Sequence, residues 1–449
     1  MRKITYISIA LGLCASVFSC SKDTFEPVSE GNDDAANPKP AVDANLWGET
    51  IPVTVRTDVL NDAYYKDVFM DGGIKLTSRK TLPACDKLGL SLEFFTAAVE
   101  VPADSAAQKA LFWGSDEDYN GILLFPDGEP RFRLFYSNGG KSLEHGASLE
   151  APGRNAVRKF NHAGGSYLGS CAGAFLAAAR RNGNYEPRYY CLWPGNNTSS
   201  GLSDSYTGMF VDEGSPLLNY YDFGGDNHVD NVYHNGGCYA TDLFPGTETL
   251  ARYDMPGRAM HGQTSIWAWK GSAYAGRVIL CGSHPEGVTE GERLDLMAAM
   301  MRYAIDGRGI ARIKSELKNG DTYVCDRQTP DGDPTHTRIG DGQCHHYIVA
   351  IPRNAGNIRF RLEYAGDYEI NLMAKKDSFA FDADADYKST GTSNVKELEF
   401  DSLAGGLWYI GVHNTSRPEV TTGDNGYCKY SGRTELLNGL EYTISVNWD

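Results

Sequence analysis

Residues 164–178 read GGSYLGSCAGAFLAA, and this stretch decides the fold of the region around it. An apolar run typical of a strand leads into a Gly-x-Cys-x-Gly turn, and an alanine-rich run typical of a helix follows. Glycines two residues before and two residues after Cys171 let the strand and the helix pack closely around a strained turn. The stretch therefore predicts a nucleophile elbow that presents Cys171 at the carboxyl end of a strand.

The backbone near Cys171 offers candidate donors for an oxyanion. The N–H of Ala172 begins the helix, and a helix N-terminus favours a thiolate and other negative charge. Residues 121–125 read as a buried strand, and Pro126-Asp127-Gly128 follows as a loop. We expect Ala172 and Gly128 to bind the oxyanion.

A candidate base follows a second buried strand. Residues 277–281 are continuously apolar after Arg277, and the chain continues as Gly-Ser-His-Pro-Glu. His284 emerges at the carboxyl end of that strand, where open α/β sheets place their sites. Glu286 can accept a hydrogen bond from the imidazole and fix its tautomer. Each motif alone is about as often structural as functional, but together they predict a Cys171–His284–Glu286 triad.

Strand and helix patterns alternate between residues 47 and 308. The runs typical of strands, beyond those above, are 51–55, 91–95 and 167–169, and those typical of helices are 81–88, 156–162 and 290–305. This alternation predicts βαβ units in a flavodoxin-like α/β domain, with a mostly parallel sheet covered on both faces.

The pattern changes after Gly309 to short strands separated by Gly, Asp and Asn turns. These runs are 347–351, 359–362, 368–372, 407–412 and 442–446. They predict an antiparallel all-β sandwich domain over residues 309–449.

One loop of this second domain is acidic. Asp382, Asp384 and Asp386 have the spacing of a Ca²⁺ loop, but the Gly and the distal Glu of an EF-hand are missing. A solvated acidic loop is the favoured interpretation, and a calcium site is the weaker alternative.

The composition excludes several classes of function. The chain has 449 residues, enough for two or three domains. Forty-two basic and 58 acidic residues leave a net charge of −16 with no Lys/Arg-rich run, which disfavours a nucleic-acid partner. No Walker-type phosphate loop occurs, so no nucleotide cofactor is expected, and no other cofactor is indicated.

The N-terminus predicts export. A basic start precedes an apolar stretch over 7–18 that is too short to span a bilayer, so residues 1–19 read as a signal peptide. Val17-Phe18-Ser19-Cys20 resembles a bacterial lipobox, which would make Cys20 the lipidated first residue; ordinary secretion is the alternative. Residues 20–46 read as a flexible tether. We expect a membrane anchor in the bacterial cell envelope, on the periplasmic or the cell-surface side of the outer membrane.

The ten cysteines divide by position. Cys14 leaves with the signal peptide, Cys20 carries the lipid and Cys171 stays a free thiol. Seven remain, so at least one is unpaired, and Cys281 on its buried strand is the candidate. Cys325 and Cys344 could close a disulfide loop, although connectivity does not follow from sequence.

Residues 51–305 resemble the class I glutamine amidotransferase-like superfamily and, within it, the biotin-protein ligase N-terminal domain family. The resemblance is carried by the segments 164–175, Tyr233-His234-Asn235-Gly236-Gly237-Cys238 and Ser283-His284-Pro285-Glu286. It implies a cysteine nucleophile toward amide carbonyls, completed by a His-x-Glu pair, which are Cys171, His284 and Glu286 in this chain. It also implies that Asn235, Gly236 and Gly237 line the mouth of the substrate pocket. Pro-Asp-Gly at 126–128 departs from the usual Pro-Gly-Gly of the superfamily.

Residues 403–412, Leu-Ala-Gly-Gly-Leu-Trp-Tyr-Ile-Gly-Val, weakly resemble bacterial pre-peptidase C-terminal domains. That resemblance implies an accessory module that faces carbohydrate or protein. The ATP- and biotin-binding segment of a biotin ligase is missing from the sequence, so biotin ligation is not expected.

Two functions remain open. The first is an envelope lipoprotein that hydrolyses an amide, peptide or γ-glutamyl bond through a thioester on Cys171, with a substrate that the sequence does not identify. The second is a non-catalytic binding or scaffold lipoprotein that recognises an envelope glycan or protein. The intact triad favours the enzyme, and the irregular loop at 126–128 and the appended sandwich favour the binding protein.

Overall fold

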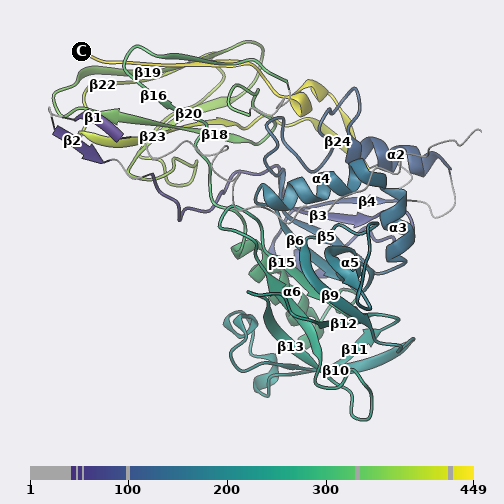
Figure 1. The fold of residues 1–449 in the computed structure, drawn as a ribbon. Coiled ribbons are helices and arrows are strands. Elements are labelled where there is room, and N and C mark those ends of the chain that lie inside the picture. The colour runs from purple at the N-terminus through teal and green to yellow at the C-terminus, as the bar shows by residue number, and fades with distance from the viewer. Residues whose placement is uncertain (1–41, 47–48, 53–54, 98–101, 329–333, 423–427) are drawn as a thin grey trace, which may run out of the picture. The chain divides into compact units, whose positions relative to one another are not determined.

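The computed structural model describes residues 42–46, 49–52, 55–97, 102–328, 334–422 and 428–449 (Figure 1). All of them belong to one compact unit, residues 32–449. The expected signal peptide, Cys20 and most of the expected tether lie outside the described residues. Within the described part of the chain, no helix has the length and apolar character needed to cross a membrane.

Five parallel strands form one half of the largest sheet, in the order β4-β3-β5-β6-β15. They are β3 Lys66–Gly72, β4 Leu92–Thr96, β5 Phe132–Ser137, β6 Ser166–Ser170 and β15 Val278–Cys281. Along β5, Phe135 enters one core cluster while Leu134 and Tyr136 enter another, because a strand sends successive side chains to opposite faces. Both faces of this half are therefore buried, as the apolar runs predicted.

Helices cover each face of the parallel half. They are α1 Pro83–Leu88, α2 Pro102–Trp113, α3 Ser142–Ser148, α4 Glu150–His162, α5 Ala172–Ala177 and α6 Glu292–Asp306. Side chains of α2, α4 and α5 pack with Phe135, and those of α1 and α6 pack with Leu134 on the other face. The helices predicted at 81–88, 156–162 and 290–305 are confirmed as α1, α4 and α6.

The other half of the sheet is largely antiparallel, which corrects the prediction of a mostly parallel sheet. From β14 the order continues β12-β9-β7-β8, and β13, β10 and β11 extend from β14 as a branch. These strands are β7 Ala178–Arg181, β8 Asn184–Tyr185, β9 Trp193–Ser199, β10 Ser205–Val211, β11 His228–His234, β12 Cys238–Thr241, β13 Glu248–Asp254 and β14 Thr264–Trp269. The reversal occurs where β14 pairs antiparallel with β15. The side-chain period of a strand does not encode the direction of its neighbour, so the sequence could not reveal this half.

Residues 121–125 do not form the predicted strand. Leu124 makes only an isolated bridge with Pro130, and the chain joins the sheet later, as β5. Ile122 and Phe125 are buried, so the run is apolar because it packs in the core and not because it pairs in a sheet. Periodicity cannot separate these two causes in a short apolar run.

Two further sheets follow α6, in the orders β16-β18-β23-β20-β21 and β17-β26-β19-β22. Their strands are β16 Ser315–Leu317, β17 Thr322–Cys325, β18 Cys344–Ile351, β19 Gly356–Tyr364, β20 Ile370–Lys376, β21 Tyr387–Ser389, β22 Val395–Ser402, β23 Gly406–Asn414 and β26 Tyr442–Asn447. Val349 of the first sheet and Phe360 of the second belong to the same core cluster. The two sheets therefore bury their inner faces against each other.

Smaller elements complete the described chain. The hairpin of β1 Val42–Leu46 and β2 Glu49–Pro52 is separate from the large sheet, so residues 51–52 of the strand expected at 51–55 pair outside that sheet, and residues 53–54 lie outside the described residues. A second hairpin comprises β24 Glu419–Thr422 and β25 Cys428–Ser431. Short 3₁₀ turns occupy Pro216–Asn219, Phe223–Gly225 and Thr434–Asn438.

The described cysteines are free thiols, namely Cys85, Cys171, Cys191, Cys238, Cys281, Cys325 and Cys344. The expectation for Cys281 is confirmed, and the suggested Cys325–Cys344 disulfide is wrong. The two side chains lie in different core clusters, where the sulfur of Cys325 is 3.2 Å from the Tyr347 hydroxyl and that of Cys344 is 3.6 Å from Nε2 of His346. Cys428 has no described side chain.

The three carboxylates of the acidic loop do not converge. Asp382 pairs with His413, Asp384 pairs with Lys375, and Asp386 accepts the backbone N–H of Lys376 at 2.9 Å. Among the described residues, no group of three His, Cys, Asp or Glu side chains could hold a metal ion. The separate partners favour the interpretation of a solvated acidic loop.

Candidate active site

Cys171 lies on a strained turn between β6 and α5, with φ 48° and ψ −101°. A residue with a Cβ adopts such angles only where the surrounding structure imposes them. Its N–H donates to the carbonyl of Cys281 in β15 at 2.9 Å. A Cβ on Gly169 would lie 2.4 Å from the carbonyl carbon of Gly173, and one on Gly173 would lie 2.3 Å from the carbonyl oxygen of Ser137. Both glycines are therefore needed for the close packing that the elbow motif predicted.

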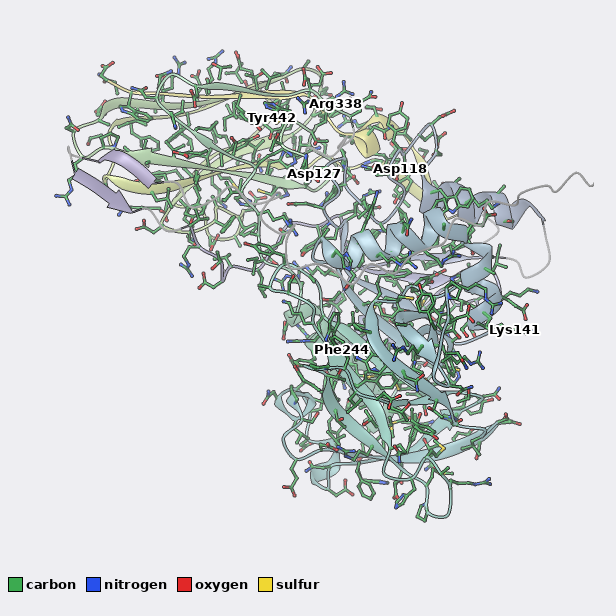
Figure 2. The ribbon with its side chains drawn as sticks, viewed as in Figure 1. Asp118, Asp127, Lys141, Phe244, Arg338 and Tyr442 are labelled. Atoms are coloured by element: carbon green, nitrogen blue, oxygen red, sulfur yellow. The ribbon has the colours of Figure 1, made fainter. Side chains whose placement is uncertain are left out.

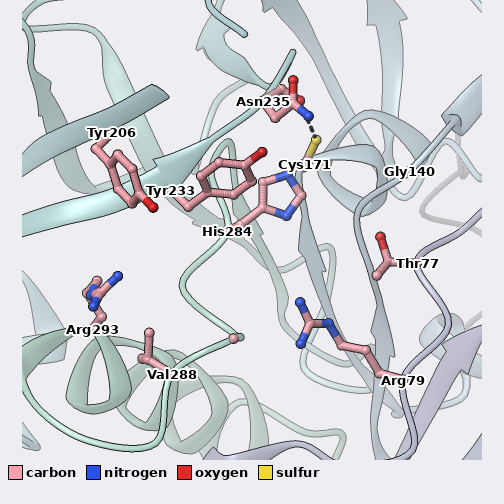
Figure 3. A pocket seen from close by; sticks show the side chains of 11 residues that line it. Thr77, Arg79, Gly140, Cys171, Tyr206, Tyr233, Asn235, His284, Val288 and Arg293 are labelled. Atoms are coloured by element: carbon pink, nitrogen blue, oxygen red, sulfur yellow. Dashed lines mark hydrogen bonds between the residues drawn. The ribbon is translucent and has the colours of Figure 1, made fainter. Parts of the chain in front are cut away.

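His284 follows the carboxyl end of β15 and lies next to Cys171 (Figure 3). The backbone N–H of His284 donates to the Tyr233 carbonyl at 2.8 Å, which fixes the backbone of His284 against β11. Its Nδ1 is 3.0 Å from Oε1 of Glu286, whose side chain is almost fully buried. The carboxylate thus holds the Nδ1 proton, and Nε2 is left for chemistry on the pocket side.

The charges in this cluster favour an imidazolium. Burial would lower the pKa of His284, but hydrogen bonds to Cys171 and Glu286, together with their negative charges, raise it to about 10. Burial would raise the pKa of Glu286, yet its hydrogen bond with His284 holds that pKa below the usual value. A positive imidazolium beside a sulfur stabilises the thiolate form of a cysteine.

Two glycines after β5 complete the surroundings of the triad. A Cβ on Gly139 would lie 2.1 Å from Cε1 of His284, so the imidazole ring occupies the space that any side chain there would need. Gly140 lines the pocket and bridges Leu76. The bonds flanking that bridge run from Thr77 N–H to the Gly139 carbonyl and from Lys141 N–H to the Lys75 carbonyl. In such an antiparallel pair the N–H of Gly140 itself points away from residues 75–77.

Sequence reasoning missed Gly139 and Gly140. The signal was present, because a glycine pair follows the apolar run 132–136 after only two residues. The sequence pattern favours 121–125 as the strand beside β6, and this interpretation leaves the glycine pair outside the predicted site.

A pocket of about 500 Å³ opens at the triad (Figure 3). Its lining residues are Thr77, Arg79, Gly140, Cys171, Tyr206, Tyr233, Asn235, His284, Gly287, Val288 and Arg293. They come from the loops after β3, β5, β6 and β15, and from β10, β11 and α6. The pocket therefore lies at the carboxyl ends of the parallel strands, where α/β sheets bind ligands.

The predicted pocket residues 235–237 are only partly in the lining. Asn235 lines the pocket, and its carbonyl oxygen is 3.6 Å from the sulfur of Cys171. Gly236 donates its N–H to the Leu202 carbonyl at 2.7 Å. A Cβ on Gly237 would lie 1.8 Å from the Gly282 carbonyl oxygen. Gly236 and Gly237 therefore shape the turn that holds Asn235 and are outside the lining itself.

A second histidine, His234, supports the site from behind. Its Nε2 is 2.6 Å from the Ser200 hydroxyl, and its Nδ1 is 2.7 Å from the hydroxyl of Ser283, which precedes His284. Burial, with repulsion from His284, lowers the pKa of His234 to about 4. This neutral imidazole links β11 to the segment that carries His284.

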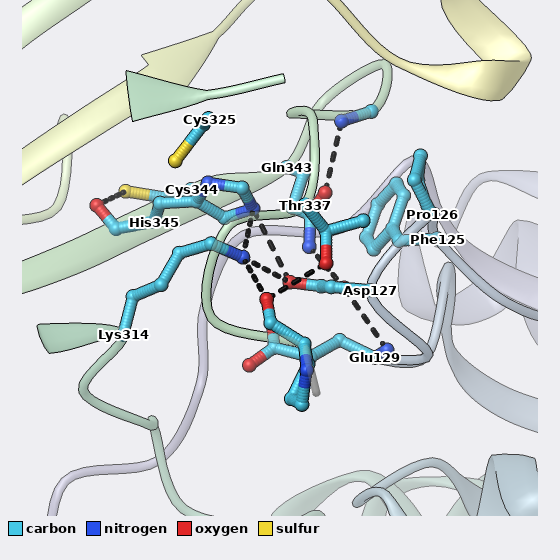
Figure 4. A network of polar contacts seen from close by, with 12 residues as sticks. Phe125, Pro126, Asp127, Glu129, Lys314, Cys325, Thr337, Gln343, Cys344 and His345 are labelled. Carbon is cyan, nitrogen blue, oxygen red and sulfur yellow. Dashed lines mark hydrogen bonds and ion pairs between the residues drawn. The ribbon is translucent and has the colours of Figure 1, made fainter. Parts of the chain in front are cut away.

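Gly128 is not near Cys171, and its expected oxyanion role is wrong. The 126–128 turn precedes β5, whereas Cys171 follows β6, and β5 and β6 run parallel. At about 3.3 Å per residue, the six residues of β5 put roughly 20 Å between the two edges of the sheet. Asp127, which Figure 2 labels, instead lies 3.2 Å from both Lys314 Nζ and His345 Nε2 (Figure 4).

No protein-family model matches the chain, and no curated protein matches it. Among solved structures, a glutamine amidotransferase is 18% identical, covers 48% of this chain and 90% of its own, and has a TM-score of 0.31. A glutamine amidotransferase from Methylobacillus flagellatus is 10% identical, with 50% and 72% covered and a TM-score of 0.29. The pre-peptidase C-terminal domain of a Bacillus anthracis collagenase is 14% identical, with 30% and 98% covered and a TM-score of 0.20. These scores are low, so the fold is assigned here from the strand order and the elbow.

Proposed function

We propose that this chain is a cysteine-dependent amide hydrolase with Cys171 as nucleophile, His284 as acid and base, and Glu286 as the residue that orients His284. The proposal rests on one observation, the strained Cys171 placed beside a His284–Glu286 pair at the mouth of a pocket. A purely structural cysteine has no need of these angles or of these neighbours.

The first half of the reaction forms a thioester. The thiolate of Cys171 attacks the amide carbonyl carbon, and the carbonyl oxygen takes up the negative charge. The N–H groups of Ala172 and Gly140 are the proposed donors to that oxygen, with Gly140 in place of Gly128. The imidazolium of His284 gives its Nε2 proton to the amine nitrogen as the C–N bond breaks.

The second half regenerates the enzyme. Water attacks the thioester carbonyl while neutral His284 takes one of its protons, and the C–S bond breaks. The products are a carboxylic acid and an amine, and Cys171 and His284 return to their starting charges. Glu286 keeps its hydrogen bond to Nδ1 throughout and stabilises the imidazolium each time it forms.

We further propose how the rest of the chain serves this site. Residues 47–308 are a catalytic domain of the biotin-protein ligase N-terminal type within the amidotransferase-like superfamily. Residues 309–449 are an accessory β-sandwich of the pre-peptidase type. Cys20, after removal of residues 1–19, carries the lipid that anchors the protein to the bacterial envelope.

The test uses the purified full chain and measures the alkylation of each cysteine by iodoacetamide at pH 7, with mass spectrometry to locate the adduct. Cys171 should react at least about tenfold faster than a free thiol of ordinary pKa, because only the thiolate is nucleophilic. His284→Ala should remove this advantage. Cys281→Ala, on the neighbouring strand, is the matched control and should leave the rate at Cys171 unchanged.

A second measurement addresses turnover. A panel of aryl amides is incubated with the chain in the presence of hydroxylamine, which converts a thioester into a hydroxamate. Hydroxamate formed by the wild-type chain and absent with Cys171→Ala would establish the acyl-enzyme. Ordinary thiol reactivity at Cys171, unaffected by His284→Ala, would contradict the proposal and favour the non-catalytic binding protein.

A further inference from the structure

The pocket beside Cys171 is positively charged, although the whole chain carries a net charge of −16. Arg79 and Arg293 both line it (Figure 3). The two side chains come from distant parts of the sequence, the loop after β3 and the start of α6. Because acidic residues outnumber basic ones over the whole protein, two arginines that line one pocket and form no ion pair with a described carboxylate are an informative exception.

Arg79 has unused hydrogen-bonding capacity. Its Nε is buried and has no hydrogen-bond partner. The charge of Arg79 helps to lower the pKa of the Glu286 carboxyl, although no ion pair joins the two side chains. Its terminal nitrogens lie 3.4 and 3.7 Å from where a Cβ on Gly287 would be, so the guanidinium lies within van der Waals distance of residue 287. A guanidinium that is partly desolvated and unpaired is costly unless a ligand supplies the missing acceptor.

Arg293 is in a similar state on the other side of His284. Its Nη1 donates to the Asn231 carbonyl at 3.1 Å, which orients the guanidinium without neutralising it. No described carboxylate forms an ion pair with it. Tyr206 and Val288 lie near it in the pocket wall (Figure 3). The planar group therefore still presents free N–H donors of the kind that bind a carboxylate in a two-point contact.

The described lining of the same pocket contains no acidic side chain to attract a cation. Among the described residues that line it, none is an Asp or a Glu. Glu286 is engaged by His284 through Oε1, and Asp204 accepts the Tyr233 hydroxyl at 3.1 Å outside the lining. An ammonium group close to Arg79 and Arg293 would be repelled by both guanidinium groups.

We propose that the substrate is an amide that carries a carboxylate, and no ammonium group, close to the reacting carbonyl, and that Arg79 and Arg293 are the residues that select it. The proposal rests on the amide hydrolysis proposed above and names its substrate class. Free amino-acid amides, whose ammonium group lies close to their carboxylate, are disfavoured by the same two charges.

The test compares three methanethiosulfonates that attach a 2-carboxyethyl, a 2-hydroxyethyl or a 2-aminoethyl group to Cys171. In each case the thiolate attacks the sulfenyl sulfur, a mixed disulfide forms and methanesulfinate leaves. Rates at pH 7 on the purified full chain are divided by the rates of the same reagents with 2-mercaptoethanol, which removes their intrinsic differences. The carboxyethyl reagent should exceed the hydroxyethyl reagent by roughly tenfold, and the aminoethyl reagent should fall below both.

Variants connect the preference to the two arginines. Arg79→Gln and Arg293→Gln should each lower the carboxyethyl-to-hydroxyethyl ratio severalfold, and the double variant should bring it near one. Arg302→Gln is the matched control, because Arg302 is an exposed arginine on the same helix as Arg293 and outside the pocket lining. The hydroxyethyl rate reports the integrity of the site in every variant and should stay within about twofold of wild type for Arg302→Gln.

The outcomes separate the two proposals. A ratio near one in the wild-type chain, a preference for the aminoethyl reagent, or a ratio unchanged in the double variant would overturn the assignment of the substrate class. A Cys171 that is not activated would slow all three reagents together and leave their ratio measurable, so it would count against hydrolysis and not against the charge preference.

Discussion

Two buried histidines of this protein contact a carboxylate at nearly the same distance and are held in opposite protonation states. Nδ1 of His284 is 3.0 Å from Glu286, and Nε2 of His345 is 3.2 Å from Asp127. The pKa of His284 is raised to about 10 against the effect of burial, by its contacts with Cys171 and Glu286. Burial, followed by the charge of Lys314, lowers the pKa of His345 to about 4.

The third member of each cluster makes the difference. At His284 the neighbour is a sulfur that can become negative, and it adds to the attraction of Glu286. At His345 the neighbour is the ammonium group of Lys314, 3.4 Å from Nε2, which already pairs with Asp127 at 3.2 Å (Figure 4). A carboxylate beside a histidine is therefore not by itself the mark of an active site. The chemistry needs a third group of the right charge and a pocket, and the Cys171 cluster has both.

The largest expected effect tests whether the two histidines differ in function. His284→Ala should lower the rate of amide hydrolysis by roughly 10²- to 10⁴-fold, the usual contribution of a general acid–base group. His345→Ala should leave the iodoacetamide rate at Cys171 unchanged in the folded protein, because its cluster lies at the other edge of the sheet. Equal losses of reactivity in His284→Ala and His345→Ala would contradict the prediction that only His284 acts in the reaction.

The next effect concerns stability at the second cluster. The side chains of Lys314 and Asp127 are 6% and 5% exposed, so Lys314→Met would leave a buried carboxylate without its main counter-charge. Breaking a buried pair in this way costs about 3–5 kcal/mol of unfolding free energy. Urea denaturation measures it, and Lys318→Met, at an exposed lysine nearby, serves as the control. A loss under 1 kcal/mol would mean that the pair is not truly buried.

A smaller effect distinguishes the two glycine loops. Gly139→Ala would place a methyl group 2.1 Å from Cε1 of His284 and displace the ring, with a loss of roughly 10- to 100-fold in hydrolysis. Gly128→Ala meets no atom within 4 Å and should leave hydrolysis unchanged, although its φ of 85° costs about 1 kcal/mol of stability. A loss of activity in Gly128→Ala comparable to that in Gly139→Ala would support the expectation that the loop at 126–128 binds the oxyanion.

The smallest effect is the opposite pH dependence of the two histidines. The pKa of His284 is higher in the folded state, so its contribution to stability is complete below about pH 6.5 and is lost as the pH rises through about 10. The pKa of His345 is lower in the folded state, so its contribution is present above about pH 6.5 and is lost as the pH falls toward 4. Differences of a few kcal/mol at most are expected across each range.

These differences can be measured by comparing the melting temperatures of the wild-type chain, His284→Gln and His345→Gln from pH 4 to pH 10. The advantage of the wild type over His284→Gln should shrink toward high pH, and its advantage over His345→Gln should shrink toward low pH. The same trend in both comparisons would contradict the assigned protonation states.

The local parts of the site could be predicted from the sequence. The elbow around Cys171 depends on glycines within two residues of it, and the His284–Glu286 contact joins residues two apart, so both are written in short segments. The helices α1, α4 and α6 were predictable for the same reason, because their apolar period repeats within one segment.

The errors concern pairing between distant segments. Which run lies beside β6 depends on the partner and not on the run itself, and residues 121–125 and 132–137 are both mostly apolar, although the second run contains Arg133. Gly128, the expected second oxyanion donor, therefore lies at the opposite edge of the sheet from Cys171. The antiparallel half of the sheet and the separate environments of Cys325 and Cys344 could not be predicted for the same reason, because both depend on contacts between segments distant in the sequence.

The sequence by itself determined the chemistry that is available: a cysteine on a strained turn, a histidine with its carboxylate, and two regions of different strand pattern. Only the tertiary structure decided which glycine lies against His284, which carboxylate already has a lysine, and that Arg79 and Arg293 meet at one pocket. The physical reason is the distance along the sequence over which each property is determined. Backbone angles and helix periods depend on neighbours along the chain, whereas burial, ion pairing and pocket charge depend on segments that only the packed sheet brings together.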